Sequence, residues 1–241
     1  MIRITVIPAA GLGTRLYPLT RSINKALLPF GDKTIIEHQL DLIVNTTIEI
    51  VYIIIREEDN FVTQIGYQYR NIKVRYIVQK RLEGLASAIM ETDKYIKNEK
   101  FLLLLCDSIF TRDTILKLLY DRSDIDESVI LIAKENDNID EYGVVELGSD
   151  QQITKVCAVN SKMKSSNYII TGAYITANSI YDIIRNLKED ETGEKNFNTA
   201  LDILASRRKL KYLIVSDAYY DVGTLKKYLY SLKRKMAETV N

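Results

Sequence analysis

Short apolar runs alternate with segments of helical periodicity over the first 135 residues, and this alternation restricts the chain to few architectures. The runs are too short for helices but long enough for buried strands, and the segments between them carry apolar residues three or four positions apart. This order predicts an α/β protein with a mixed, mostly parallel central sheet covered by helices, whose ligands collect at the carboxyl ends of the strands. The expected strands are Ile2–Ile7, Ile48–Ile55, Val74–Val78, Phe101–Leu105 and Val129–Ala133, and the expected helices are Thr34–Asn45, Asn60–Tyr69, Leu85–Tyr95 and Asp113–Asp121.

The second half of the chain has shorter strands and a different rhythm. No linker rich in Pro, Gly or Ser separates the halves, so we expect one domain over residues 1–241, with a first half over 1–135 and a smaller second half over 136–241. The expected strands there are Gly143–Leu147, Gln152–Val159, Tyr168–Thr176 and Leu210–Val215, and the expected helices are Ser179–Leu187, Phe197–Arg207 and Thr224–Met236.

Charge and cysteine usage argue against several classes of function. The 33 basic and 32 acidic side chains leave a net charge of +1, so no global field attracts nucleic acid or an anionic membrane. Cys106 and Cys157 lie in apolar runs without metal-ligand spacing and are expected to be buried thiols, as in a reducing compartment. The first apolar run is too short for a signal peptide or a membrane span, so we expect a cytoplasmic protein.

Residues 8–29 contain all three prolines of the chain and form its most informative segment. A strand followed by small residues, Gly11 and Gly13, allows close approach of the backbone to a phosphate. The glycine spacing fits neither the dinucleotide fingerprint nor the Walker A loop. The segment therefore predicts a phosphate-binding loop of another kind.

Six motifs appear in an order that resembles the sugar-1-phosphate nucleotidyltransferases, with the closest similarity to glucose-1-phosphate thymidylyltransferases and UTP–glucose-1-phosphate uridylyltransferases. The resemblance covers nearly the whole chain and implies a Rossmann-like, three-layer α/β/α nucleotidyltransferase fold. It also implies that residues 1–135 bind the nucleotide and residues 136–241 the acceptor. The motifs are Gly11-x-Gly-Thr-Arg15 with Lys25, Gln79 with Glu83-Gly-Leu-Ala86, Leu105-Cys-Asp107, Tyr142-Gly143, Ser166-Asn-Tyr168 with Thr171-Gly-Ala-Tyr174, and Tyr220-Asp-Val-Gly-Thr224.

The resemblance implies two catalytic cations, Arg15 and Lys25, which suit a reaction that joins two polyanions. It also implies that Asp107 and Asp221 bind Mg²⁺. A carboxylate that ends a buried strand, as Asp107 does, is costly unless it is paired or bound to a cation. For Asp221 alone, a role as the cap of the following helix is an equally good interpretation.

The remaining implied contacts divide between the two substrates. A glutamine amide at position 79 offers a donor and an acceptor to the edge of thymine or uracil, and the absence of a side chain at position 84 leaves room for the base. The implied nucleotide-binding residues are Ala10, Gly11, Gly13, Thr14, Arg15, Gln79 and Gly84, and the implied sugar-binding residues are Tyr142, Gly143, Asn167 and Tyr174.

One family motif is missing. Related enzymes carry Glu-Lys-Pro shortly before the Ser-Asn-Tyr segment, whereas this chain has neither Glu nor Pro from Ile153 to Asn167. Lys155, Lys162 and Lys164 are candidates to replace the lost lysine. The expected function is transfer of a nucleotidyl group from dTTP or UTP to a sugar 1-phosphate, with glucose 1-phosphate the leading acceptor and pyrophosphate as product.

Three points stay open at this stage. The acceptor could be a non-sugar phosphate or an unusual sugar phosphate, with CTP as the nucleotide. The chain could instead be a regulatory homologue that binds nucleotide without catalysis, although retention of both aspartates argues against that. The sequence is compatible with a homo-oligomer, and no nucleic-acid or membrane partner is expected.

Overall fold

Four neighbouring parallel strands form one side of the sheet in the computed structural model, which describes residues 1–159, 166–190, 193–215, 217 and 219–239. In spatial order they are β7 (Phe101–Leu104), β1 (Ile4–Pro8), β4 (Ile50–Ile55) and β6 (Ile72–Val78). All four were predicted from apolar runs. Because the strands are parallel, the loops that follow β1, β6 and β7 emerge at the same edge of the sheet.

The second half of the chain continues the same sheet with antiparallel strands. Strand β12 (Tyr168–Thr176) pairs antiparallel with β7 and with β9 (Ser128–Lys134). Strand β13 (Leu210–Ile214) pairs parallel with β9. Strand β10 (Val144–Leu147) pairs antiparallel with β12, and β11 (Ile153–Cys157) pairs antiparallel with β10. Strand β9 thus lies outside the group of four parallel strands. The sequence could not predict this position, because an apolar run indicates burial on both faces but does not identify the neighbouring strand.

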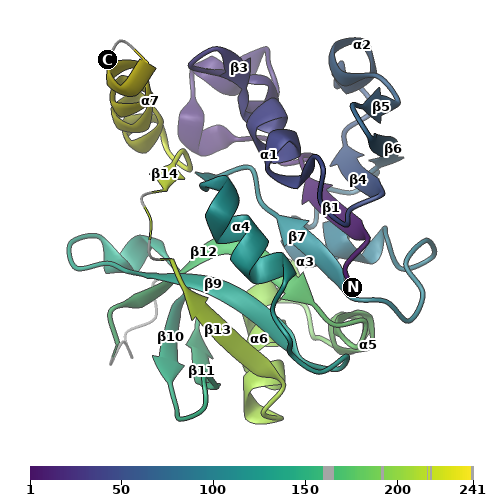
Figure 1. The fold of residues 1–241 in the computed structure, drawn as a ribbon, viewed down its shortest axis with the longest axis vertical. Helices are drawn as coiled ribbons and strands as arrows, with labels where there is room; N and C mark the ends of the chain where they lie inside the picture. Colours follow the sequence, from purple (N-terminus) through teal and green to yellow (C-terminus); the bar gives the residue numbers. More distant parts are fainter. Residues whose placement is uncertain (160–165, 191–192, 216, 218, 240–241) are drawn as a thin grey trace.

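Helices cover both faces of this mixed sheet, as the layered fold predicts (Figure 1). Short pairings add two small sheets, and one of them, between β8 (Ser108–Ile109) and β14 (Tyr220–Asp221), is important for the site. The helices are α1 (Ile35–Ile43), α2 (Phe61–Ile65), α3 (Gly84–Met90), α4 (Arg112–Leu119), α5 (Ile180–Arg185), α6 (Phe197–Ser206) and α7 (Leu225–Thr239). The other short elements are β2 (Pro29–Phe30), β3 (Lys33–Thr34), β5 (Gln68–Tyr69) and the 3₁₀ turns at Thr14–Leu16, Leu19–Arg21, Lys25–Leu27 and Ile139–Glu141.

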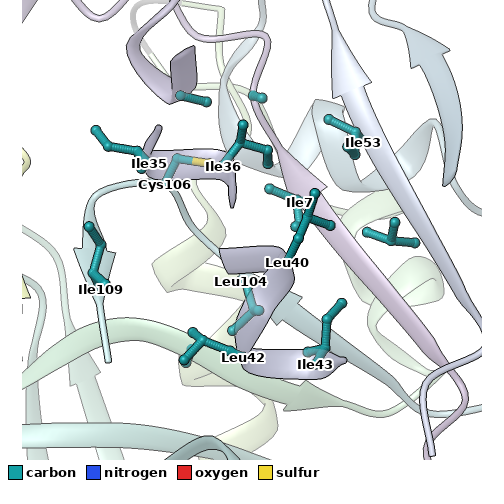
Figure 2. Packing of buried hydrophobic residues seen from close by; sticks show 14 of the residues in the cluster. Ile7, Ile35, Ile36, Leu40, Leu42, Ile43, Ile53, Leu104, Cys106 and Ile109 are labelled. Atoms are coloured by element: carbon teal, nitrogen blue, oxygen red, sulfur yellow. The ribbon is translucent and has the colours of Figure 1, made fainter. Parts of the chain in front are cut away.

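Alternate residues of the strands enter two separate hydrophobic cores. Ile7 faces the core beneath α1, whereas its neighbour Val6 faces the core beneath α3, α5 and α6. Figure 2 shows Ile36 and Leu40 of α1 close to Ile7 of β1 in the first core. Helix α1 starts with a capping box in which Thr34 and Glu37 bond to each other's backbone N–H. The helix is therefore held at its start as well as along its apolar face.

Two predicted helices are shorter than expected. The segment predicted as helix 60–69 forms α2 over five residues and then β5, and the segment predicted as helix 85–95 ends at Met90 and continues as turns. In the second case the Thr92 hydroxyl donates to the Ile89 carbonyl at 2.7 Å, an alternative to helical pairing that this residue type often takes.

The structure also confirms the state of the cysteines. Cys106 and Cys157 are free and buried, and burial raises the pKa of the Cys106 thiol to about 12. Within the ranges that the structure describes, no helix combines the length and apolar character needed to cross a membrane.

Candidate active site

The loop after β1 is held in a compact shape by side chains that come later in the same segment. Asn24 donates from Nδ2 to the Ala9 carbonyl at 2.7 Å, and the Thr20 hydroxyl donates to the Gly13 carbonyl at 2.7 Å. Gly13 has a φ of +63°, and a Cβ there would lie 3.2 Å from Thr20 Cγ2 and 3.3 Å from Lys25 Cβ. Glycine is therefore required at position 13 both by conformation and by space.

A buried polar network positions Lys25. The neighbouring Asn24 caps the turn at Lys25–Leu27 by accepting from Ala26 N–H, and its amide also donates to Asp59 Oδ2 at 2.9 Å. Asp59 in turn forms a salt bridge with Arg56 at 2.8 Å. Burial lowers the pKa of Lys25 below its ordinary value of 10.5, and the nearby Asp107 carboxylate opposes that shift.

The loop forms the wall of a pocket of about 500 Å³. The start of α3 also lines this pocket, as does Asp107, three residues after the end of β7. Every residue predicted to bind the nucleotide or to act on it lines this pocket: Ala10, Gly11, Gly13, Thr14, Arg15, Lys25, Gln79 and Gly84.

Gln79 brings an unsatisfied polar group to this pocket. Its side chain is 6% exposed, and Nε2 is among the buried side-chain atoms that have no hydrogen-bond partner within the described chain. A buried N–H without a partner is costly, so this amide in the pocket lining is available to a ligand acceptor. Close by, Gly84 has a φ of +83°, and a Cβ there would lie 2.6 Å from Glu194 Oε2, so a larger residue at position 84 would displace the Glu194 carboxylate.

Strand pairing brings Asp107 and Asp221 together although 114 positions separate them. In the β8–β14 ladder Asp221 lies opposite Ser108, and Val222 N–H donates to the Asp107 carbonyl at 2.8 Å. A Cβ at Gly223 would lie 3.1 Å from Asp221 Oδ1 and 3.7 Å from Asp107 Cβ. The glycine therefore keeps the space between the two aspartates open.

The loop that carries Asp107 is fixed from α1. Gln39 is fully buried, and its amide donates to the carbonyls of Leu105 at 3.2 Å and of Ser108 at 2.6 Å. These two carbonyls flank Asp107 in the chain. The aspartate is thus held by the backbone on both sides while its carboxylate faces the pocket.

A second pocket of about 180 Å³ begins where the first one ends. Arg15, Asp107 and Gly223 line both pockets, so the two form one continuous site. The second pocket is lined by the predicted acceptor residues Tyr142, Gly143 and Tyr174, and by Asp221, Asn198 and Lys227. The pKa of Tyr142 is raised mainly by burial and secondly by the hydrogen bond to Asp221. The hydroxyl therefore stays protonated and donates to the Asp221 carboxylate.

A family model for nucleotidyl transferases matches residues 4–238. The chain belongs to the nucleotidyl transferase family. Among curated relatives of this nucleotidyl transferase, the bifunctional protein GlmU of Methanococcus vannielii is 34% identical over 224 residues, covering 90% of this chain and 51% of the relative. The glucose-1-phosphate thymidylyltransferase of Neisseria meningitidis is 30% identical over 224 residues, covering 91% of this chain and 77% of that enzyme. The chain spans about half the length of the GlmU relatives.

Solved structures of related enzymes share the fold. A UDP-glucose pyrophosphorylase in complex with UDP-glucose superposes with a TM-score of 0.86 at 24% identity, covering 99% of this chain and 100% of the other. A UTP-bound enzyme of the same kind from Acinetobacter baumannii gives a TM-score of 0.81 at 20% identity, covering 99% and 94%. The predicted nucleotidyltransferase fold is confirmed by this similarity.

The two aspartates of this nucleotidyl transferase offer the hard oxygen ligands that a divalent cation prefers, although Asp221 Oδ2 already accepts from the Tyr142 hydroxyl and lies 3.2 Å from Lys227 Nζ. Among described residues, the hydrogen bond made by the Asp107 carboxylate is a long one of 3.5 Å from the Ser108 hydroxyl, which leaves most of its acceptor capacity unused. The same part of the chain contains no group of three or more His, Cys, Asp and Glu arranged for a metal. Two carboxylates with the remaining positions filled by water and phosphate are the usual protein contribution to a Mg²⁺ site beside a nucleotide.

Two sequence-based candidates lie away from the site. Asn167 lines neither pocket, and its amide donates to Asn136 Oδ1 at 3.1 Å. Lys155, a candidate for the missing lysine, lies on β11 opposite Glu146 and also lines neither pocket. The other two candidates, Lys162 and Lys164, fall outside the described residues.

Lys227 is the most notable lining residue that the sequence analysis missed. It lies in the first turn of α7, and its ammonium contacts Tyr142 and Glu141, 85 and 86 positions earlier. A basic residue in a first helical turn opposes the helix dipole, and that unfavourable placement was the available sequence signal. Glu194 was missed as well, because it lies in a polar segment without regular periodicity.

Proposed function

We propose that this nucleotidyl transferase moves a nucleotidyl group from dTTP or UTP to a sugar 1-phosphate, with glucose 1-phosphate as the leading acceptor. The observation that carries the proposal is the continuous site: a pocket lined by the glycine loop and by the unpartnered Gln79 amide meets a smaller polar pocket at Asp107. Relatives named as thymidylyl- and uridylyltransferases support the same substrate classes.

The proposed reaction needs charge neutralisation and alignment more than it needs a base. An oxygen of the sugar phosphate attacks the α-phosphorus in line, and the bond to the leaving pyrophosphate breaks. Because a phosphate monoester is already anionic near neutral pH, its oxygen needs no proton removed. Arg15, Lys25 and the loop N–H groups would stabilise the charge on the pyrophosphate, and such stabilisation, together with alignment, usually contributes most to the rate of these transfers.

We also propose Mg²⁺ as the cofactor, held by Asp107 and Asp221. When bound, the ion would supply positive charge to the reacting phosphates. The chain's own groups do the rest: Gln39 fixes the Asp107 loop, Asn24 fixes the Lys25 turn, and the Gln79 amide would donate to a carbonyl oxygen of the pyrimidine.

Pyrophosphate release from a substrate panel tests the proposal. The purified protein is assayed with dTTP, UTP, CTP, ATP and GTP against glucose 1-phosphate, other hexose 1-phosphates and phosphocholine, with and without Mg²⁺. We expect release with a sugar 1-phosphate and dTTP or UTP, dependent on the metal. Release with phosphocholine and CTP alone would favour the second candidate, a non-sugar acceptor, for which the missing Glu-Lys-Pro motif is the supporting observation.

A further inference from the structure

Lys227 lines the second pocket and is the centre of a tight polar cluster. Its Nζ lies 2.5 Å from Glu141 Oε2, 2.7 Å from the Tyr142 hydroxyl and 3.2 Å from Asp221 Oδ2. The ammonium also lies 4.1 Å from the centroid of the Tyr142 ring, within the range of a cation–π contact. The lysine side chain is 20% exposed, so the cluster fixes the charge at the pocket wall.

The charges of this pocket require such a cation. Its described lining contains three carboxylates, those of Asp107, Glu141 and Asp221, against two cations, Arg15 and Lys227. Arg15 also lines the larger pocket, where the triphosphate would occupy it. Lys227 is therefore the cation, within the described lining, that belongs to the smaller pocket alone.

We propose that Lys227 binds the phosphate of the acceptor and takes the place of the lysine that related enzymes carry in the missing Glu-Lys-Pro motif. This inference rests on the proposed function, because it assumes a phosphorylated acceptor in the second pocket. The acceptor phosphate must reach the junction of the two pockets at Asp107, and Asp221, which Lys227 contacts, lies beside Asp107 at that junction.

The cluster also explains how the ammonium becomes available. A lysine ammonium has three donors, and Glu141, Tyr142 and Asp221 accept from them here. The Glu141 side chain is 48% exposed, so its carboxylate can exchange the ammonium for water at low cost. A phosphate oxygen can then take the place of that carboxylate beside Lys227. Tyr142, through its hydroxyl and ring, keeps the ammonium in place during the exchange.

Binding measurements on three variants test the inference. The variants are Lys227→Met, Lys227→Arg and, as a matched control, Lys226→Met, which removes the same charge from an exposed position one residue earlier. Isothermal titration measures the affinity for glucose 1-phosphate and for inorganic phosphate, each with the protein saturated by a UTP analogue that cannot be cleaved at the α-phosphorus. We expect Lys227→Met to weaken both ligands by about 10- to 100-fold, the range for a lost charge-assisted contact, with nucleotide affinity unchanged. Lys227→Arg should recover most of the loss, and Lys226→Met should bind like the parent protein.

The outcomes separate this inference from the proposed function. If the parent protein releases pyrophosphate with a sugar 1-phosphate but Lys227→Met binds glucose 1-phosphate normally, the inference is wrong and the function stands. If no acceptor supports release but phosphate binding still depends on Lys227, the proposed function is wrong, and the part of the inference that stands is a phosphate-binding site at Lys227. Two results would show that Lys227 has only a structural role. One is a parallel loss of nucleotide affinity and thermal stability in Lys227→Met, and the other is absence of phosphate binding in the parent protein.

Discussion

Gly172→Ala offers a sharp test of how the fold positions Asp107. Gly172 lies in β12 with a φ of +95°, where the register with β9 shifts, and its carbonyl accepts from Leu105 N–H at 2.9 Å. A Cβ at this position would lie 2.9 Å from Asp107 Oδ1 and 3.4 Å from Leu105 Cβ. The substitution therefore introduces both backbone strain and a steric conflict with the carboxylate.

The two effects have different sizes and different readouts. A non-glycine residue at this φ costs about 1–3 kcal/mol, and in a domain of this size each kcal/mol lowers Tm by about 2–4 °C. The conflict is relieved by rotating the carboxylate, because Oδ1 is the free end of a side chain, so it adds little to that loss. The rotation displaces the oxygen by roughly 0.5 Å from its place, given ordinary contact distances. Since a misplacement of about 1 Å costs about 100-fold in rate, we expect a loss of kcat of about 10- to 100-fold.

Gly66→Ala is the matched control for this experiment. Gly66 also has a positive φ, +74°, but a Cβ there meets nothing within 4 Å, and the residue lines neither pocket. Thermal unfolding and steady-state pyrophosphate release are measured on both variants. Both should lose several degrees of Tm, and Gly172→Ala alone should lose kcat. Equal kcat values in the two variants would refute the argument that position 172 must be glycine to leave room for Asp107.

Three further predictions concern the charges and the base contact of the site. Asp107→Asn and Asp221→Asn should each abolish metal-dependent pyrophosphate release without a large loss of Tm, and near-normal turnover in either would remove the metal assignment. Gln79→Glu replaces the buried donor by an acceptor and should weaken UTP binding by about 10- to 100-fold while leaving acceptor affinity unchanged, as measured by titration. Burial holds the pKa of Lys25 below 10.5, so the ammonium is present below that lowered pKa and lost above it. UTP affinity without metal should therefore fall as pH rises through this range, while Lys25→Arg should keep its affinity; superimposable pH curves would contradict the role of burial.

Strong local periodicity explains which parts of the fold were predictable. Helix α1 and strand β12 were predicted to within a few residues because apolar spacing, capping and β-branched residues agree there. The predicted helix over residues 85–95 was too long because its apolar spacing continues past Met90, where the Thr92 hydroxyl takes a competing hydrogen bond. The partner of β9 was not predictable, since an apolar run reports burial but not which strand lies beside it.

The site, like the fold, has residues that could be predicted from the sequence and residues that could not. The glycine loop and Asp107 could be proposed because they follow buried strands, where parallel topology collects ligand-binding residues, whereas the role of Gln79 was implied by the family resemblance alone. The role of Lys227 was not predicted, because a cation in a first helical turn is a weak signal and its contacts are with Tyr142 and Glu141, which lie 85 and 86 positions earlier in the chain. Sequence spacing within α7 shows only that Lys227 lies one turn from Thr224 and does not indicate what that face meets.

The segment from β14 into α7 accounts for the charge balance of the whole site. It supplies Asp221, the second carboxylate of the site, and Lys227, six residues later in the chain. The negative charge of Asp221 is therefore paired with the Lys227 ammonium, whose Nζ lies 3.2 Å from Asp221 Oδ2. Figure 1 shows this segment beside the loop region that follows β1, and the Tyr228 hydroxyl donates to the Pro29 carbonyl there. Two neighbouring carboxylates without a cation would repel each other and strain the β8–β14 pairing. Because Lys227 lies 3.2 Å from Asp221 in the free protein, it reduces this repulsion, and the proposed phosphate ligand would meet an ammonium that is already in place.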